Sequence, residues 1–238
     1  MTQIVEELVK CGACGKGNQV SVMTSYSSFG SCDLDTRPPA MFPYTIYLQE
    51  CSHCGYVAPE IAEENKGILE FLDSEMYKTC DGIEPVDNDA RRYIQYALIQ
   101  AHNKVSSLLD GTGTNSTQED IFWGYMNAAW ACDDCAENDK KNSSHAKEDA
   151  VVCRKRCLDL INALIVGMED PEEKEGFIGI KADLLRRTGQ FDALIVEYEN
   201  RVFQSPVLNQ IIKFQLARAK ERDDKRYNMD HVRQTENA

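Results

Sequence analysis

The 238-residue sequence predicts an α+β fold, in which a small antiparallel ribbon is followed by an all-α array of helices. Two observations carry this prediction. Before residue 60, short β-branched and aromatic stretches surround two C-x-x-C-G motifs. From residue 58 onward, apolar residues recur at the three- and four-residue spacing of amphipathic helices. We therefore expect a ribbon module at 1–60, a helical domain at 61–228 and a frayed tail at 229–238.

The two motifs supply four cysteines with the spacing of a metal site: Cys11, Cys14, Cys51 and Cys54. Two intervening residues allow both sulfurs of a tight turn to face one ion. The glycine that follows can adopt the left-handed conformation that turns backbone N–H groups toward the sulfurs. Zn²⁺ accepts four thiolates in a tetrahedron. The spacing therefore predicts one structural zinc ion, bound without an open position for substrate; four unrelated buried cysteines are the alternative.

The ribbon is expected to contain strands at 4–9, 19–24 and 44–49, and the last two are expected to pair and bring the motifs together. The loop Ser25–Pro43 is rich in Ser, Gly and Pro. Its charged residues Asp33, Asp35 and Arg37 suggest a partner-binding surface or a surface that docks the ribbon on the helices. A solvated or structural loop is the simpler interpretation.

Helices are expected at 68–77, at 90–109, from Ser116 with Glu119 as a capping box, and around 150–164. Asp170-Pro171 and Ser205-Pro206 predict two further helix starts. The segment 177–206 fits the tetratricopeptide pattern in part, with matches at Ala182, Leu185, Gly189, Phe191, Tyr198 and Pro206. Leu194 and Lys181 depart from that pattern, and an ordinary helical bundle is the alternative.

The whole chain resembles a bacterial family of unknown function that couples an N-terminal four-cysteine zinc ribbon to tetratricopeptide-like helices. The resemblance rests on the two motifs, on the loop sequence 33–39 (Asp-Leu-Asp-Thr-Arg-Pro-Pro) and, more loosely, on 129–134. It implies metal ligands at Cys11, Cys14, Cys51 and Cys54, and it implies no activity.

Four further cysteines occupy helical segments: Cys132, Cys135, Cys153 and Cys157. If their helices form an antiparallel hairpin, four sulfurs could converge on a second metal or an iron–sulfur cluster. Burial as ordinary core residues is the favoured interpretation, because free cysteine is among the most buried residue types. The sequence contains none of the motifs G-x-S-x-G, P-loop, G-x-G-x-x-G or H-E-x-x-H, so we expect no enzyme.

The net charge of −13 bears on the partners. Residues 1–60 hold three basic and six acidic residues, which disfavours nucleic acid and favours a protein or peptide partner with basic residues. The N-terminus lacks the basic and apolar regions of a signal peptide, and we find no apolar run of membrane-spanning length. We therefore expect a cytoplasmic protein with reduced thiols.

Taken together, these features predict a structural zinc-binding, protein-interaction protein that acts as a scaffold or adaptor. The alternatives are a nucleic-acid- or transcription-associated zinc ribbon and, third, a thiol or metal enzyme that uses the helical cysteines.

Overall fold

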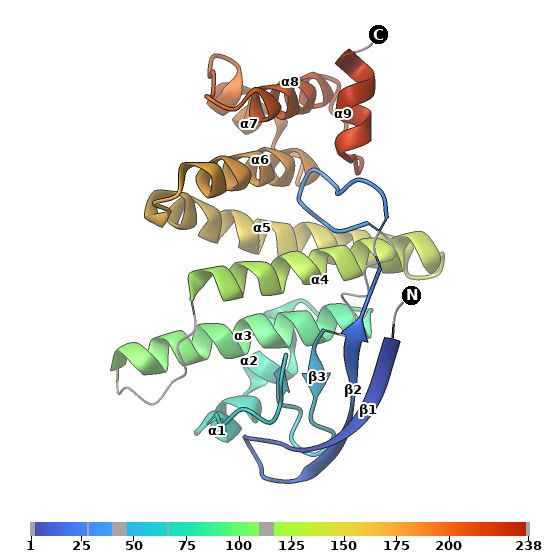
Figure 1. The fold of residues 1–238 in the computed structure, drawn as a ribbon, viewed down its shortest axis with the longest axis vertical. Coiled ribbons are helices and arrows are strands. Elements are labelled where there is room, and N and C mark those ends of the chain that lie inside the picture. The colour runs from blue at the N-terminus through green and yellow to red at the C-terminus, as the bar shows by residue number, and fades with distance from the viewer. Residues whose placement is uncertain (1–2, 28, 40–46, 66, 110–116, 237–238) are drawn as a thin grey trace. The chain divides into compact units, whose positions relative to one another are not determined.

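The computed structural model describes residues 3–27, 29–39, 47–65, 67–109 and 117–236 (Figure 1). Its class is α+β, with two short antiparallel strand pairs near the N-terminus followed by helices. The chain forms two compact units, Met1–Ser27 with Pro43–Cys153, and Ser28–Phe42 with Arg154–Ala238. Each unit combines two separate stretches of the chain. The domain bounds 1–60 and 61–228 stay a prediction.

Each cysteine motif lies in the turn of its own hairpin. Strand β1 (Gln3–Lys10) pairs with β2 (Gly17–Ser25), and β3 (Gln49–Glu50) pairs with β4 (Val57–Ala58). The expected pairing of 19–24 with 44–49 is therefore wrong for the described residues, because 19–23 pair with β1; residues 44–46 lie outside the described part. A short turn closes a hairpin at a smaller entropic cost than a long loop does.

The helices of the first unit follow, and the 3₁₀ turn Cys80–Gly82 (η2) precedes the longer ones. The elements are α1 (Ile68–Leu72), α2 (Glu75–Lys78), α3 (Asn88–Leu109), α4 (Gln118–Asn138) and the first part of α5 (Ser143–Gly167). Figure 1 shows α3 and α4 side by side. Gly124 permits this approach, because a Cβ there would lie 2.8 Å from the Ala97 Cβ.

Two of the predicted helix boundaries in this unit need correction. The expected helix 68–77 is broken into α1 and α2, because the Ser74 hydroxyl accepts a hydrogen bond from the Tyr77 amide and starts a new helix. Helix α4 is capped by a Thr117–Asp120 capping box rather than by Ser116 and Glu119. Ser116 itself lies outside the described residues.

The second unit contains the end of α5 and the helices α6 (Pro171–Arg187), α7 (Phe191–Tyr198), α8 (Pro206–Lys220) and α9 (Met229–Glu236). Both predicted proline starts are confirmed: the side chains of Asp170 and Ser205 accept hydrogen bonds from backbone amides of α6 and α8. One apolar cluster joins α6, α7 and α8, made of Ala182, Leu185, Leu194, Tyr198, Leu208, Ile212 and Ala219. Residues 229–236, expected to fray, form α9 instead.

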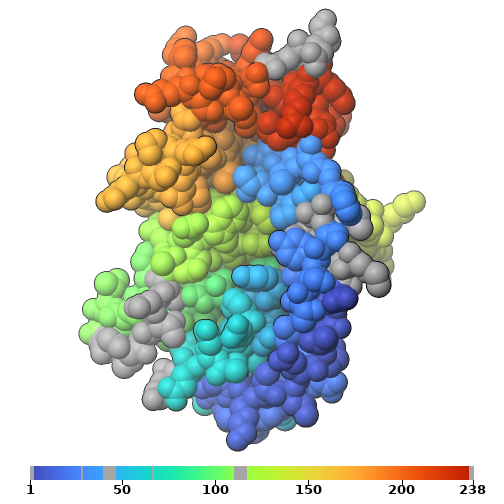
Figure 2. Space-filling view, viewed as in Figure 1, coloured from blue at the N-terminus to red at the C-terminus, as the bar shows by residue number. Residues whose placement is uncertain are grey.

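The loop segment 31–37 belongs to this second unit. The Leu34 amide donates to the Tyr227 carbonyl oxygen at 3.0 Å, and the Met229 amide donates to the Cys32 carbonyl oxygen at 3.1 Å. Figure 2 shows this blue segment against the red α9. Asp35 and Arg37 are only 2 % and 5 % exposed, so they form no open partner-binding surface. This burial favours a structural role over a solvated loop, and the docking of the ribbon on the helices stays a prediction.

Across the described part of the chain, helices that combine the length and the apolar character needed to cross a membrane are absent.

Candidate metal centre

The two cysteine motifs form turns with the same backbone hydrogen bonds. We call Cys11–Gly15 the first knuckle and Cys51–Gly55 the second. In each, the amide of the glycine donates to the carbonyl oxygen of the first cysteine, at 2.8 Å and 2.9 Å. The amide of that cysteine donates to the carbonyl oxygen five residues later, at 2.9 Å and 2.8 Å. Both glycines have positive φ, 74° and 72°, which is why glycine suits these positions.

The four cysteine sulfurs of the knuckles converge. Their Sγ atoms all lie within 4.8 Å of one another. The Sγ atoms of Cys11 and Cys54 are 3.8 Å apart, and those of Cys14 and Cys51 are 3.7 Å apart. A tetrahedron with sulfurs about 2.3 Å from its centre has edges of about 3.8 Å. The sulfur positions therefore fit a tetrahedral metal ion with four thiolate ligands.

Backbone amides favour negative charge on these sulfurs, but burial opposes it and raises the pKa of the Cys54 thiol. Burial raises the pKa of the Cys51 thiol, but hydrogen bonds from the His53 and Cys54 amides and from the Cys54 and Cys11 side chains together lower this pKa to about 6. Burial raises the pKa of the Cys11 thiol, against hydrogen bonds from the backbone amides of its own knuckle. Four sulfurs this close repel one another as thiolates, and a bound dication removes that repulsion.

Asn18 on β2 joins the two knuckles, and sequence reasoning missed it. Its Nδ2 donates to the Lys16 carbonyl oxygen at 3.0 Å and lies 3.4 Å from the Cys51 Sγ. Its Oδ1 accepts from the amide and the hydroxyl of Ser52, at 2.9 Å and 3.0 Å. Asn18 is 5 % exposed. Its buried amide group lies on β2, directly after the first knuckle, and helps to orient the Cys51 sulfur of the second knuckle.

The knuckles also pack on the chain that follows them. The Gly12 amide donates to the Ile61 carbonyl oxygen at 2.7 Å, and a Cβ on Gly12 would lie 1.9 Å from the Glu63 carbonyl oxygen. No side chain fits there without moving the backbone. The Tyr77 hydroxyl of α2 donates to the Gly55 carbonyl oxygen. The segment after the ribbon therefore helps to fix both turns.

The helical cysteines form no comparable group. Among the described residues, the four knuckle cysteines are the one group of three or more Cys, His, Asp or Glu residues whose ligand atoms could hold a metal ion together. Cys132 and Cys153 are fully buried, and a hydrogen bond between their thiols, with burial, raises the pKa of Cys132. Cys157 is fully buried, and Cys135 is partly exposed. The burial of Cys132, Cys153 and Cys157 agrees with the core interpretation, and Cys135 lies at the edge of the core.

The histidine of the second knuckle does not join the sulfurs. Its ring Nε2 lies 3.2 Å from the Gly17 carbonyl oxygen, and the side chain is exposed. His102 stacks on the Phe71 ring with the ring centres 4.3 Å apart. The candidate ligand set is thus sulfur alone, and four thiolates would complete the coordination of a zinc ion.

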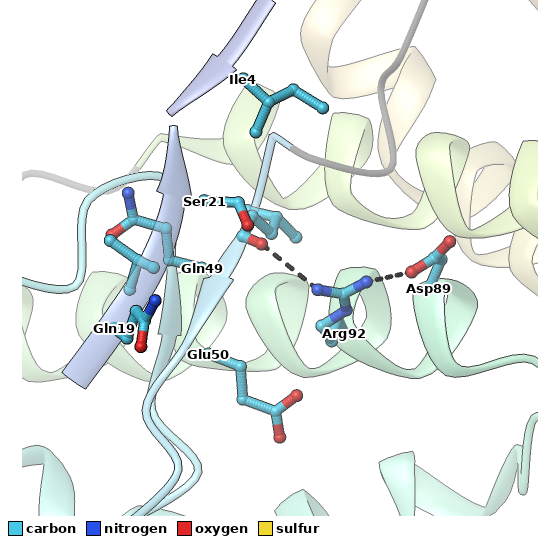
Figure 3. Close-up of a pocket in the computed structure, with 9 residues that line it drawn as sticks. Ile4, Gln19, Ser21, Gln49, Glu50, Asp89 and Arg92 are labelled. Carbon is cyan, nitrogen blue, oxygen red and sulfur yellow. Dashed lines mark hydrogen bonds and ion pairs between the residues drawn. The ribbon is translucent and has the colours of Figure 1, made fainter. Parts of the chain in front are cut away.

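A pocket of about 400 Å³ lies among β2, β3 and α3 of the same unit (Figure 3). Figure 3 shows Arg92 paired with the Asp89 carboxylate, and its guanidinium also donates to the Leu48 carbonyl oxygen at 3.5 Å. Glu50 is paired with Arg91 at 2.8 Å. Because these charges already have partners within the protein, the pocket adds no chemistry to the metal centre.

Comparison of the chain with protein-family models, with curated proteins and with solved structures finds no match, so the residues themselves carry the functional argument.

Proposed function

We propose that this protein is a scaffold or adaptor in which one structural Zn²⁺ folds the N-terminal hairpins and the helices bind a protein or peptide partner. The convergence of four knuckle sulfurs at tetrahedral spacing carries the zinc assignment. A bound zinc ion supplies folding free energy here rather than catalysis, because four thiolates complete its coordination.

The helical part is proposed to be tetratricopeptide-like, in keeping with the family resemblance. Three matched positions, Ala182, Leu185 and Tyr198, all lie in the apolar cluster of α6–α8. Gly189 has φ 73° in the turn between α6 and α7, as a tight helical hairpin requires. Stacked hairpins of this kind offer extended surfaces to peptide partners.

Charge favours a protein over nucleic acid as the partner. The chain carries a net −13, and a four-thiolate zinc centre adds further negative charge. Phosphate backbones need clustered cations to displace their counterions. A partner with basic residues is attracted at long range.

The test uses the full chain, because residues 28–42 belong to the second unit and a cut at residue 60 would remove them from it. The immobilised protein is offered to cytosolic extract with crosslinking, with and without nuclease. We expect capture of a defined protein that survives nuclease treatment at physiological salt. Retention of nucleic acid that weakens steeply with salt would instead support the nucleic-acid-associated ribbon.

A further inference from the structure

A pocket of about 370 Å³ lies between the C-terminal end of α7 and one face of α8, within the second unit. Its apolar lining comes from the buried Tyr198 of α7 and from Ile212, Leu216 and Ala217 of α8. This volume falls in the range of pockets that hold a small ligand or a bulky side chain.

Basic groups dominate the charged lining of this pocket. Arg201, Lys213 and Lys220 line it, together with a single acid, Glu199, which pairs with Lys220 at 2.7 Å. Lys213 is exposed and makes no ion pair with the described residues. The local charge is therefore positive on a chain whose net charge is −13.

Arg201 is held in place by aromatic rings. Its guanidinium carbon lies 5.7 Å from the centre of the Tyr198 ring and 5.3 Å from that of Phe203. Its nearest carboxylate is Glu197, at 3.8 Å, where an exposed pair contributes little. Stacking restricts the guanidinium without consuming its hydrogen-bond donors, so an incoming carboxylate meets a positioned group.

We propose that this α7–α8 pocket binds an acidic peptide segment of a partner protein. An apolar side chain of the segment enters between the helices, and flanking Asp or Glu carboxylates contact Arg201 and Lys213. The inference rests on the proposed function and specifies the site and chemistry of the partner. The net charge of −13 attracts basic residues elsewhere on the partner at long range, whereas the locally positive pocket contacts an acidic segment of that partner.

The apolar lining distinguishes a peptide from nucleic acid. A nucleic acid carries one phosphate charge on every nucleotide and has no aliphatic side chain to fill the apolar lining formed by Tyr198, Ile212 and Leu216. A peptide can place one apolar side chain in the pocket and only a few carboxylates at its edge. Charge contacts and apolar contacts should therefore each make a measurable contribution to the affinity for the peptide.

The test measures binding of fluorescent peptides to the full zinc-loaded chain. The probe is a short peptide with one leucine flanked by aspartates; its counterpart carries lysines in place of the aspartates. Lys213→Glu reverses one pocket charge, and Ala217→Phe fills the pocket from an exposed helix position without changing charge. Lys155→Glu, an exposed position on α5 outside the pocket lining, is the matched charge control. Circular dichroism checks that each variant is folded.

We expect the acidic peptide to bind in preference to the basic one. Lys213→Glu and Ala217→Phe should each weaken its binding about tenfold, and Lys155→Glu should change it little. Equal binding of both peptides, or equal losses in Lys213→Glu and Lys155→Glu, would overturn the assignment. So would a single-stranded oligonucleotide that competes with the peptide.

The same variants separate this inference from the proposed function. If the full chain captures a defined protein and both pocket variants capture it equally well, the pocket assignment fails while the scaffold function stands. If the chain captures no protein and binds neither peptide, both fail.

Discussion

Strand β1 leaves 86 % of Leu8 exposed, whereas Leu194 of α7 is completely buried. The contrast extends to the surroundings of both residues. Most of the β1–β2 hairpin faces solvent, and within its two strands Asn18 and Val20 are the buried residues. Helices α6–α8 share a continuous apolar cluster. We therefore expect the β1–β2 hairpin in particular to depend on a metal ion for the stability that the helices obtain by burying apolar surface.

Metal removal should separate the two regions most strongly. Zinc binding to such sites contributes on the order of 10 kcal/mol, so a chelator should unfold the hairpins 3–25 and 49–58 while α6–α8 remain folded. Hydrogen exchange on the full chain, with and without chelator, measures both regions at once. The loop 31–37 sharpens the test: because it bonds to 227–229, its amides should stay protected. Simultaneous loss of protection in α6–α8 would show that the helices depend on the metal.

Truncation of the helical core should have the converse effect. Leu194→Ala is expected to lower the free energy of unfolding of the second unit by about 2–5 kcal/mol, because it leaves a cavity in a buried cluster. Urea titration measures the loss, and metal analysis should find the zinc content unchanged. Val196→Ala is the control on the same helix, since Val196 is 86 % exposed. Similar losses in the two variants would contradict the assigned core.

The burial of Asp33 in the loop 31–37 should make the stability of the protein depend on pH independently of the metal. Burial, then the nearby Asp35 carboxylate, raises the pKa of Asp33 from 3.8 to about 6. A carboxyl group whose pKa is higher in the folded state stabilises the protein at low pH, and this stability is lost as pH rises from about 4 to about 6. The full change corresponds to about 3 kcal/mol; we expect about 2 kcal/mol, because 15 % of the side chain remains exposed.

Asp33→Asn should remove this dependence and make the protein more stable above pH 6. Comparing the free energies of unfolding of wild type and variant at each pH cancels the acid-induced loss of zinc. Asp192→Asn, at a side chain that is 78 % exposed, should leave the change of unfolding free energy with pH the same as in the wild type. If the unfolding free energy of Asp33→Asn changed with pH as it does in the wild type, the Asp33 carboxylate would not be the cause of the pH dependence.

The smallest expected effect concerns Asn18, which links the knuckles. Asn18→Ala removes the bonds to Ser52 and the contact with the Cys51 sulfur, and should weaken zinc binding about tenfold. Competition with a chromophoric chelator measures the affinity. Gln19→Ala, at the exposed neighbouring position, should leave it unchanged. Equal affinities for both variants and the wild type would show that Asn18 has no influence on the metal.

The sequence was most informative where structure is local. The knuckles were predictable because two residues between cysteines determine the turn, and the starts of α6 and α8 were predictable because Asp170 and Ser205 cap their own helices. Asn18 was not predictable, since its partner Ser52 belongs to the other hairpin. An asparagine inside a strand, where that residue is disfavoured, was the available signal.

Long-range contacts account for the remaining differences. The burial of the loop 31–37 depends on backbone bonds to Tyr227 and Met229, nearly 200 residues away, as with the Ser31–Asp230 hydrogen bond at a separation of 199 residues. The polar sequence of α9 predicts a frayed tail. The buried Val232 and the partly buried Met229 anchor this helix in a small cluster with Leu34 and Phe214. Neither contact has a signature in the neighbouring sequence.

X-ray absorption at the zinc edge of the purified chain, combined with metal analysis, tests the four-sulfur site most directly. We predict about one zinc per chain with four sulfur neighbours at about 2.3 Å. Replacing Cys11 and Cys54 by serine should abolish the signal, and replacing Cys132 and Cys153 should not. A second zinc that depends on Cys132, or a coordination shell containing a histidine nitrogen or an open water position, would contradict the closed structural site.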